Sequence, residues 1–126
     1  MLAEYCAVQD AYVYQIRVYS GSGYTAYSPA AAPNCVYAPK GSTVGVVVAV
    51  RSTGTVYPVL HYGYGNWWWP VNDILAKPIG THNGYTLYEA NITLPDSGVR
   101  YVFKIYHTGG IYWVNVGGGN GQICAS

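Results

Sequence analysis

Tyr85-Thr86-Leu87-Tyr88-Glu89-Ala90-Asn91-Ile92-Thr93-Leu94 is the most regular stretch of this sequence. Its alternation predicts a β-strand, with one face inward (Tyr88, Ala90, Ile92, Leu94) and the other outward (Leu87, Glu89, Asn91, Thr93). Pro95-Asp96-Ser97-Gly98 follows with the residues of a tight turn. Val99 to Tyr106 then alternates again, with Val99, Tyr101, Phe103 and Ile105 inward and Arg100 and Lys104 outward. Two amphipathic strands around a turn indicate a β-protein.

The neighbouring segments extend this pattern. Thr43 to Val50 is β-branched and apolar on both faces, which is typical of a central strand. Val56 to Tyr62 predicts a strand with Tyr57, Val59 and His61 on the face opposite Val56, Pro58, Leu60 and Tyr62. Ile111 to Val116 predicts another, with Ile111, Trp113 and Asn115 on one face. We expect Val71 to Gly84 to be a loop with a possible helical turn at residues 72–76. Short strands separated by glycine turns favour an antiparallel β-sandwich of immunoglobulin-like type.

Residues 1–40 differ from the rest of the chain in their residue pattern. We expect them to form an N-terminal arm on a sandwich domain of residues 41–126. Tyr12 to Tyr19 alternates as a strand, with Tyr12, Tyr14, Ile16 and Val18 on one face. Gly21 to Gly23 predicts a turn and Tyr24 to Tyr27 a short returning strand. Ser28 to Pro39 contains three prolines and an alanine run, which predicts an extended connection. The arm can pack on the main body or pair with a neighbouring molecule, and the sequence leaves both open.

The composition narrows the class of protein. The 126 residues suit a single domain, and charged residues make up only 9% with a net charge of +1. The six basic residues are scattered, which argues against a nucleic-acid partner. The longest apolar run, Val44 to Val50, is far shorter than the roughly 20 residues of a membrane span. Fifteen tyrosines and 16 glycines with few helix formers favour β-structure.

Three cysteines and the tyrosine-rich surface suit a secreted, extracellular protein. Met1-Leu2-Ala3-Glu4 shows neither a basic nor an apolar signal region, so we expect a mature or recombinant form. Cys6, Cys35 and Cys124 allow three pairings. We favour a Cys6–Cys35 disulfide, which would fasten the two ends of the N-terminal segment. Cys124 would then be free or joined to another chain.

A cluster of rings dominates His61-Tyr62-Gly63-Tyr64-Gly65-Asn66-Trp67-Trp68-Trp69-Pro70. Its glycines, asparagine and proline indicate a loop, so some rings are expected at the surface, where flat apolar faces bind ligands. At least one tryptophan is expected to close the end of the core. A sugar ring stacks its C–H face on an indole and needs fixed polar partners for its hydroxyls. His61, Asn66 and Asn115 are residues of that type.

The run from Tyr57 to Trp67, with its His-Tyr-Gly and Asn-Trp pairs, resembles starch-binding carbohydrate-binding modules of families twenty-five and twenty-six. The resemblance continues through Gly84-Tyr85, Ile92-Thr93-Leu94-Pro95, Tyr101-Val102-Phe103, Trp113-Val114-Asn115 and Gly117-Gly118-Gly119-Asn120, and covers residues 43–123. It implies an α-glucan platform of His61, Trp67 and Trp113, with Asn115 binding hydroxyls. Trp68 or Trp69 could take the place of Trp67. Val114 and Val116 stand where the family carries polar residues.

Catalysis has little support in the sequence. The carboxylates are spread over turns and faces, whereas a glycosidase needs two opposed ones. The histidines lack metal-ligand spacing, and no nucleophile motif occurs. We therefore expect no enzyme, no catalytic residues, no cofactor and no metal site. Asn91-Ile92-Thr93 is a sequon on an outward face, so Asn91 is a candidate glycosylation site.

Two functions follow from these features. The first is a non-catalytic α-glucan-binding module, in which Trp67 and Trp113 stack on successive glucose units. The second is a structural subunit of an extracellular filament, pilus or surface layer. In that case residues 1–40 would add a strand to a neighbour's sheet, and the surface tryptophans would contact other subunits.

Overall fold

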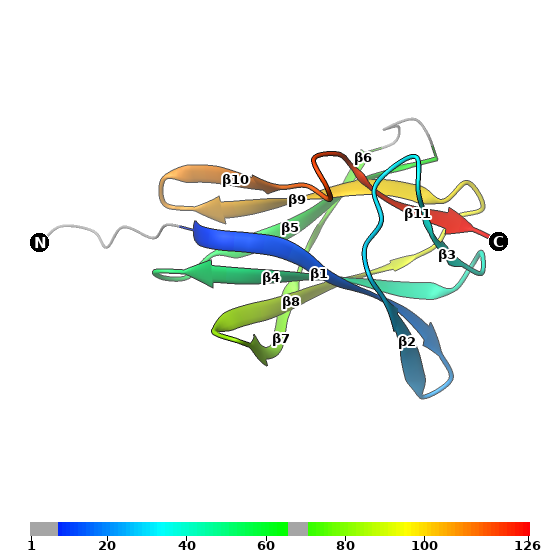
Figure 1. The fold of residues 1–126 in the computed structure, drawn as a ribbon, viewed down its shortest axis with the longest axis horizontal. Coiled ribbons are helices and arrows are strands. Elements are labelled where there is room, and N and C mark those ends of the chain that lie inside the picture. Colours follow the sequence, from blue (N-terminus) through cyan, green and yellow to red (C-terminus); the bar gives the residue numbers. More distant parts are fainter. Residues whose placement is uncertain (1–7, 66–70) are drawn as a thin grey trace, which may run out of the picture.

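Two β-sheets face each other in the computed structural model, which describes residues 8–65 and 71–126 (Figure 1). Sheet A has the strand order β2-β1-β4-β8-β7, and sheet B has the order β3-β11-β9-β5-β6 with β10 also paired to β9. The strands of sheet A are β1 (Val8–Ser20), β2 (Gly23–Tyr27), β4 (Thr43–Ser52), β7 (Lys77–His82) and β8 (Tyr85–Thr93). Those of sheet B are β3 (Val36–Ala38), β5 (Tyr57–Tyr64), β6 (Val71–Leu75), β9 (Val99–His107), β10 (Gly110–Val114) and β11 (Gly121–Ala125). The predicted β-sandwich is confirmed.

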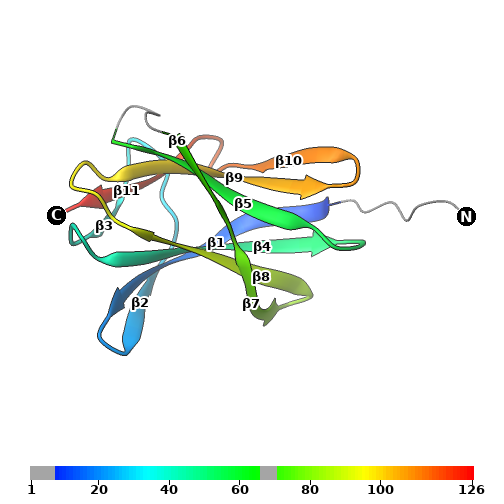
Figure 2. The ribbon, with the colours of Figure 1, turned by 180° about the vertical axis from the view of Figure 1, so that it is seen from behind.

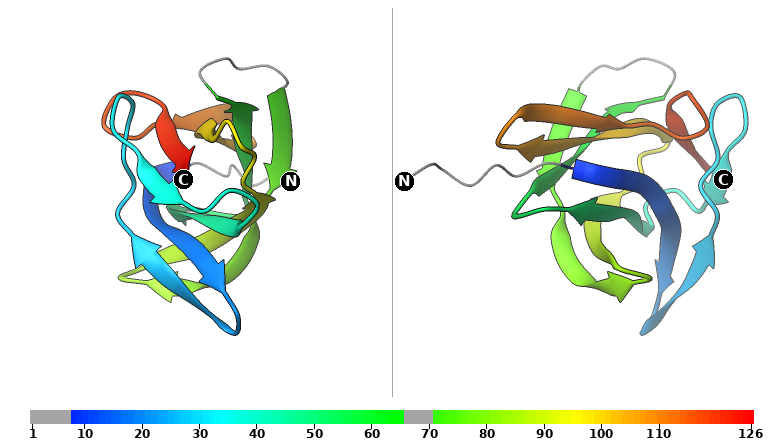
Figure 3. Two further views of the ribbon diagram at one scale, coloured as in Figure 1. Left: turned by 90° about the vertical axis from the view of Figure 1, so that its right-hand side faces the viewer. Right: turned by 60° about the vertical axis from the view of Figure 1, so that its left-hand side comes forward.

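The core lies between the two sheets, which Figure 3 shows from two further directions. It takes alternate residues of the strands, and the inward faces predicted for β8, β9 and β5 are buried there. β4 is central in sheet A, as its two apolar faces predict: Val44, Val46, Val48 and Val50 point into the core. Over residues 8–65 and 71–126 the chain forms no helix of the length and apolarity that crossing a membrane requires.

The turn at Pro95–Gly98 carries the chain from sheet A to sheet B, so β8 and β9 belong to different layers. Gly98 donates its N–H to the carbonyl of Pro95 at 2.9 Å and has φ +72°. A Cβ at this position would lie 2.5 Å from the carbonyl oxygen of Ile123. A side chain would therefore be strained by conformation and would also collide with β11.

Residues 71–84 were expected to be a loop, and that prediction is wrong. β6 pairs with β5 at the edge of sheet B, and β7 pairs with β8 at the edge of sheet A. Figure 2 shows the chain running from β6 into β7 and so bridging the two layers. β7 contains Pro78 and Gly80 with a register shift between them, which an edge strand tolerates because one side needs no ladder hydrogen bonds. Because Pro78 and Gly80 are typical of loops, the sequence did not indicate a strand here.

The segment expected as an N-terminal arm contributes to both sheets. β1 is paired on one side with β2 and on the other with β4, and β3 pairs with β11 in parallel. The predicted strand and return at Tyr12–Tyr27 are confirmed, but Tyr12 and Tyr14 face outward. A register shift between Val13 and Gln15 reverses the alternation, so that Val13 and Ile16 both face the core.

The disulfide joins Cys35 to Cys124, so the expected Cys6–Cys35 pairing is wrong. Cys35 directly precedes β3, and Cys124 lies opposite Tyr37 in the parallel β3–β11 pair. This pairing brings the two Cα atoms to 5.7 Å, within the usual range for a disulfide. β11 lies beyond Ile111–Val116, the last segment for which the sequence predicts a strand. Cys6 lies outside the described residues.

Candidate functional site

The outer face of sheet B carries His61 and Trp113, two of the residues singled out in the sequence. We call it the Trp113 face, and it consists of the outward side chains of β5, β6, β9 and β10. Directly opposed residues define its rows, since paired residues on neighbouring strands share a face. One row runs from Trp113 through Lys104 and Val59 to Leu75. The next rows are Val102–His61–Asp73 and Ile111–Tyr106–Tyr57.

Asp73 forms the centre of a polar cluster on this face. Its Oδ1 lies 2.6 Å from Nδ1 of His61, and its Oδ2 accepts a hydrogen bond of 2.9 Å from Nζ of Lys104. Burial raises the pKa of Asp73, but the hydrogen bonds from Lys104 and His61 outweigh it and hold that pKa below its usual value. The bond to Asp73 also raises the pKa of Lys104. The carboxylate only accepts, so Nδ1 of His61 carries the proton.

Trp113 stands beside this cluster with 55% of its surface exposed. Its ring centroid lies 6.2 Å from that of His61, and the two planes meet at 83°, an edge-to-face contact. Val114 on the same strand is buried in the core, so the β10 alternation fixes Trp113 outward. Asn115 is also exposed, directly after β10. The outward positions predicted for His61, Trp113 and Asn115 are therefore confirmed.

The remaining predicted ligand-binding residues, Trp67, Trp68 and Trp69, lie outside the described residues, as does Asn66. The structure thus brings together His61 and Trp113 from two separate sequence motifs, and Asn115 is exposed two residues beyond Trp113. Sequence reasoning missed Asp73 as a site residue because it interpreted residues 71–84 as a loop. The signal lay in Val71, Asp73 and Leu75, whose spacing of two residues places them on one face of a strand.

Asn91 of the sequon is exposed on β8 of sheet A. It lies opposite Gly45 of β4 in sheet A, and it lines a small pocket together with Leu75 of β6. Glycosylation at this residue stays a prediction.

The geometry defines a class of site before any comparison. An exposed indole and half-buried polar groups with fixed orientation lie on a shallow sheet surface, which suits a ligand with one apolar face and several hydroxyls.

The chain is similar in structure to a protein with a described ligand class. The solution structure of the carbohydrate binding module of the muscle glycogen-targeting subunit of protein phosphatase-1 matches with a TM-score of 0.60 and 15% identity. The match covers 94% of this chain and 78% of that chain, so it includes β1 to β3 as well as residues 43–123. At this identity the likeness shows the fold. No family model matches the sequence, and no curated protein sequence matches it either.

Proposed function

We propose that this protein is a non-catalytic module that binds an α-glucan such as starch or glycogen on the Trp113 face. The observation that carries the proposal is the exposed Trp113 held edge-to-face by His61. The indole would stack on the C–H face of one glucose unit. The resemblance of Trp113 and His61 to the starch-binding motifs and the fold shared with a carbohydrate-binding module both support it.

The polar groups beside Trp113 support the same ligand. Asp73 fixes the ring of His61, and the ammonium of Lys104 offsets the charge of the Asp73 carboxylate from the other side. A neutral hydroxylated ligand suits such a surface better than an anion or a cation. Asn115 adds an amide, which can donate and accept at once. Trp67, Trp68 and Trp69 would extend the aromatic surface, as the family resemblance implies.

The test is binding of wild type and Trp113→Ala to soluble amylose by affinity gel electrophoresis and titration calorimetry. An aromatic stacking contact contributes roughly 1–3 kcal/mol, by analogy with base stacking. Trp113→Ala should therefore weaken binding at least about tenfold. Tyr24→Ala is the matched control, because Tyr24 is 47% exposed on β2 of the opposite sheet. Equal retention of Trp113→Ala and wild type on the gel would refute the proposal.

We also propose that the protein works outside the cell. The Cys35–Cys124 disulfide supports this, since such bonds persist in oxidising compartments. Mass spectrometry of protein from its native source tests it. An intact Cys35–Cys124 bond or a glycan on Asn91 is expected, and a fully reduced, unmodified chain would contradict it.

A structural subunit of a filament remains the second candidate, and one feature favours it. All five residues of β2 are exposed, and β2 is an edge strand of sheet A that carries Tyr24 and Tyr27. An exposed edge offers unpaired backbone groups to a second copy. β2 pairs only with Ile16–Ser20 of β1, so self-association through residues 1–40 would use β2 or the side of Val8–Gln15 that β2 leaves unpaired. Filaments in negative-stain micrographs that disappear in Tyr24→Pro would support this role.

A further inference from the structure

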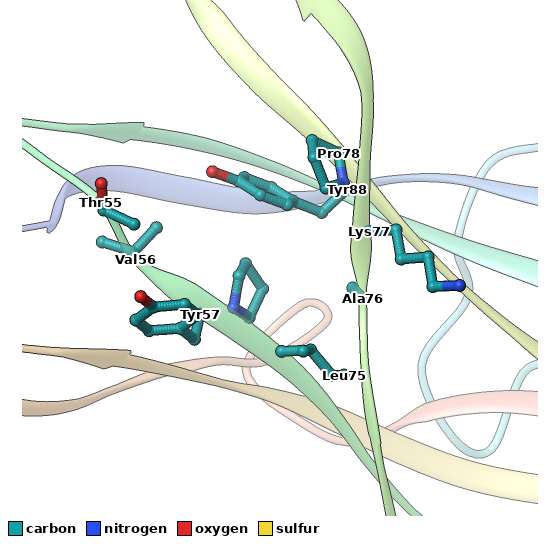
Figure 4. A pocket seen from close by; sticks show the side chains of 9 residues that line it. Thr55, Val56, Tyr57, Leu75, Ala76, Lys77, Pro78 and Tyr88 are labelled. Carbon is teal, nitrogen blue, oxygen red and sulfur yellow. The ribbon is translucent and has the colours of Figure 1, made fainter.

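A cleft lies at the end of the Trp113 face, where β6 passes into β7 and the chain leaves sheet B for sheet A. Its volume is about 300 Å³, at the lower end of the range for small-molecule sites. Strands of both sheets line it, with Tyr57 and Pro58 from β5, Leu75 from β6 and Tyr88 from β8. Figure 4 shows the ring of Tyr88 beside Pro78 and the ring of Tyr57 apart from it, on β5.

The cleft is continuous with the Trp113 face. The row that begins at Trp113 and crosses Lys104 and Val59 ends at Leu75, and the row from Ile111 through Tyr106 ends at Tyr57. Leu75 and Tyr57 both line the cleft, and they are 55% and 57% exposed. From Trp113 to Leu75 is three strand spacings, or roughly 14 Å. A chain of sugar units lying along the row would therefore reach the cleft.

The chemistry of the cleft matches a neutral, hydroxylated ring. Its floor is apolar, and it holds two phenol rings and the hydroxyl of Thr55. Within the part of the chain that the structure describes, the hydroxyls of Thr55, Tyr57 and Tyr88 have no hydrogen-bond partner, so they can serve a ligand. Lys77 is the one charged lining residue, and its ammonium points away from the two rings in Figure 4.

We propose that this cleft is a second subsite for the same glucan, holding a sugar unit between Tyr57 and Tyr88. The inference rests on the proposed function of the Trp113 face and adds to it a preference for longer glucan chains. A ligand that is too short to span from Trp113 to Leu75 occupies one subsite at a time. A longer chain bends over the edge of sheet B, occupies both and binds more tightly.

The experiment compares maltotriose with maltoheptaose by titration calorimetry in wild type, Tyr57→Ala and Thr55→Trp. Tyr57 and Thr55 are exposed, so neither change disturbs the core. Wild type should bind the longer chain at least tenfold more tightly. In Thr55→Trp, which narrows the cleft, this gain should fall about fivefold to tenfold while maltotriose affinity at the Trp113 face is kept. Tyr57→Ala should lose the same gain, and Tyr24→Ala should leave it intact.

Amide chemical shifts give a second readout. Maltoheptaose should move the resonance of Ala76 in the cleft as well as that of Trp113, and the Ala76 shift should vanish in Thr55→Trp. If both cleft variants keep the full gain with chain length, or if Ala76 does not move, the subsite is refuted while the Trp113 face stands. If wild type binds neither sugar, the proposed function fails and the subsite with it.

Discussion

The outer faces of the two sheets are both rich in aromatic side chains, yet they use them differently. On sheet A, Tyr14 and Tyr85 cover a second apolar cluster of Val47, Ala49 and Leu87. On sheet B, Trp113 covers no such cluster among the described residues, and 55% of its surface is exposed to solvent. Aromatic content therefore does not by itself locate a binding surface. What the ring is packed against decides its role.

The polar groups of the two faces differ in the same way. On sheet A the Tyr19 hydroxyl donates to Glu89, the Tyr85 hydroxyl donates to Asp10, and Arg17 lies 4.5 Å over the ring of Tyr24. These groups bind one another and so close the surface. Gly45 beneath them has room only for hydrogen, because a Cβ there would lie 1.9 Å from Oε2 of Glu89. On the Trp113 face, Asn115 and the indole are left exposed.

The largest effect should come from cutting the covalent link that fastens β3 to β11 in sheet B. The disulfide closes a sequence separation of 89 residues, for which the chain-entropy model gives about 4.6 kcal/mol. A Cys35→Ser, Cys124→Ser double variant should lose about that much free energy of unfolding in a urea titration. Cys6→Ser is the control and should behave as wild type. An equal loss in Cys6→Ser would overturn the pairing.

The next effect tests the closed character of sheet A. Glu89 has only 9% of its side chain exposed and lies 3.9 Å from Arg17. Glu89→Ala removes the acceptor of the Tyr19 hydroxyl and the ion-pair partner of Arg17, which should cost about 2 kcal/mol of unfolding free energy. Amylose binding by the folded variant should not change. Asp96→Ala, at an exposed turn, should shift the stability by less than about 0.5 kcal/mol. Lost amylose binding in folded Glu89→Ala would place sheet A in the site.

The sequence predicted the layers of this fold better than its edges. The register of central strands such as β4 and β9 is fixed by burial. A buried face requires an apolar residue at every second position, and this period of two is visible in the sequence. β6 and β7 have one free side and little buried surface, so Pro78 and Gly80 are tolerated and the period is obscured. The bulge in β1 reversed the faces of Tyr12 and Tyr14, because one extra residue shifts the period by one.

The residues of the candidate site also differ in how well the sequence predicted them. Trp113 and His61 lie on well-patterned strands, and their outward direction followed from alternation alone. Asp73 comes from an edge strand and reaches His61 only through the β5–β6 register. The partner of Cys35 could not be predicted either, because it depends on the parallel pairing of β3 with β11, which are far apart in the sequence. A local pattern shows which face of a strand a side chain lies on, whereas only the long-range strand pairing shows which residue lies next to it.

A smaller effect should follow from removing the carboxylate of the open face. Asp73 is 45% exposed, so Asp73→Ala should change the unfolding free energy by less than about 1 kcal/mol. It frees the rings of His61 and Trp113 to reorient, and amylose binding should weaken about fivefold, or about 1 kcal/mol. Glu89→Ala, by contrast, is expected to lose stability and keep its amylose binding. A variant that binds normally but unfolds easily would make Asp73 a structural residue.

The smallest effect lies in the pH dependence of stability, where the two faces should separate again. The pKa of Asp73 is lowered on folding, so its contribution is present above the unfolded value of about 3.9 and is lost as the pH falls through the folded value. Burial and Glu89 raise the pKa of Tyr19, so its contribution is present below about pH 10 and is lost as the pH rises through the folded value. Asp73→Asn should therefore flatten only the acid limb of unfolding free energy against pH, by a few tenths of a kcal/mol because Asp73 is exposed. Tyr19→Phe should flatten only the alkaline limb. Asp96→Asn, measured alongside, should leave both limbs as in wild type, and an acid limb that Asp96→Asn flattens equally would remove the special role of Asp73.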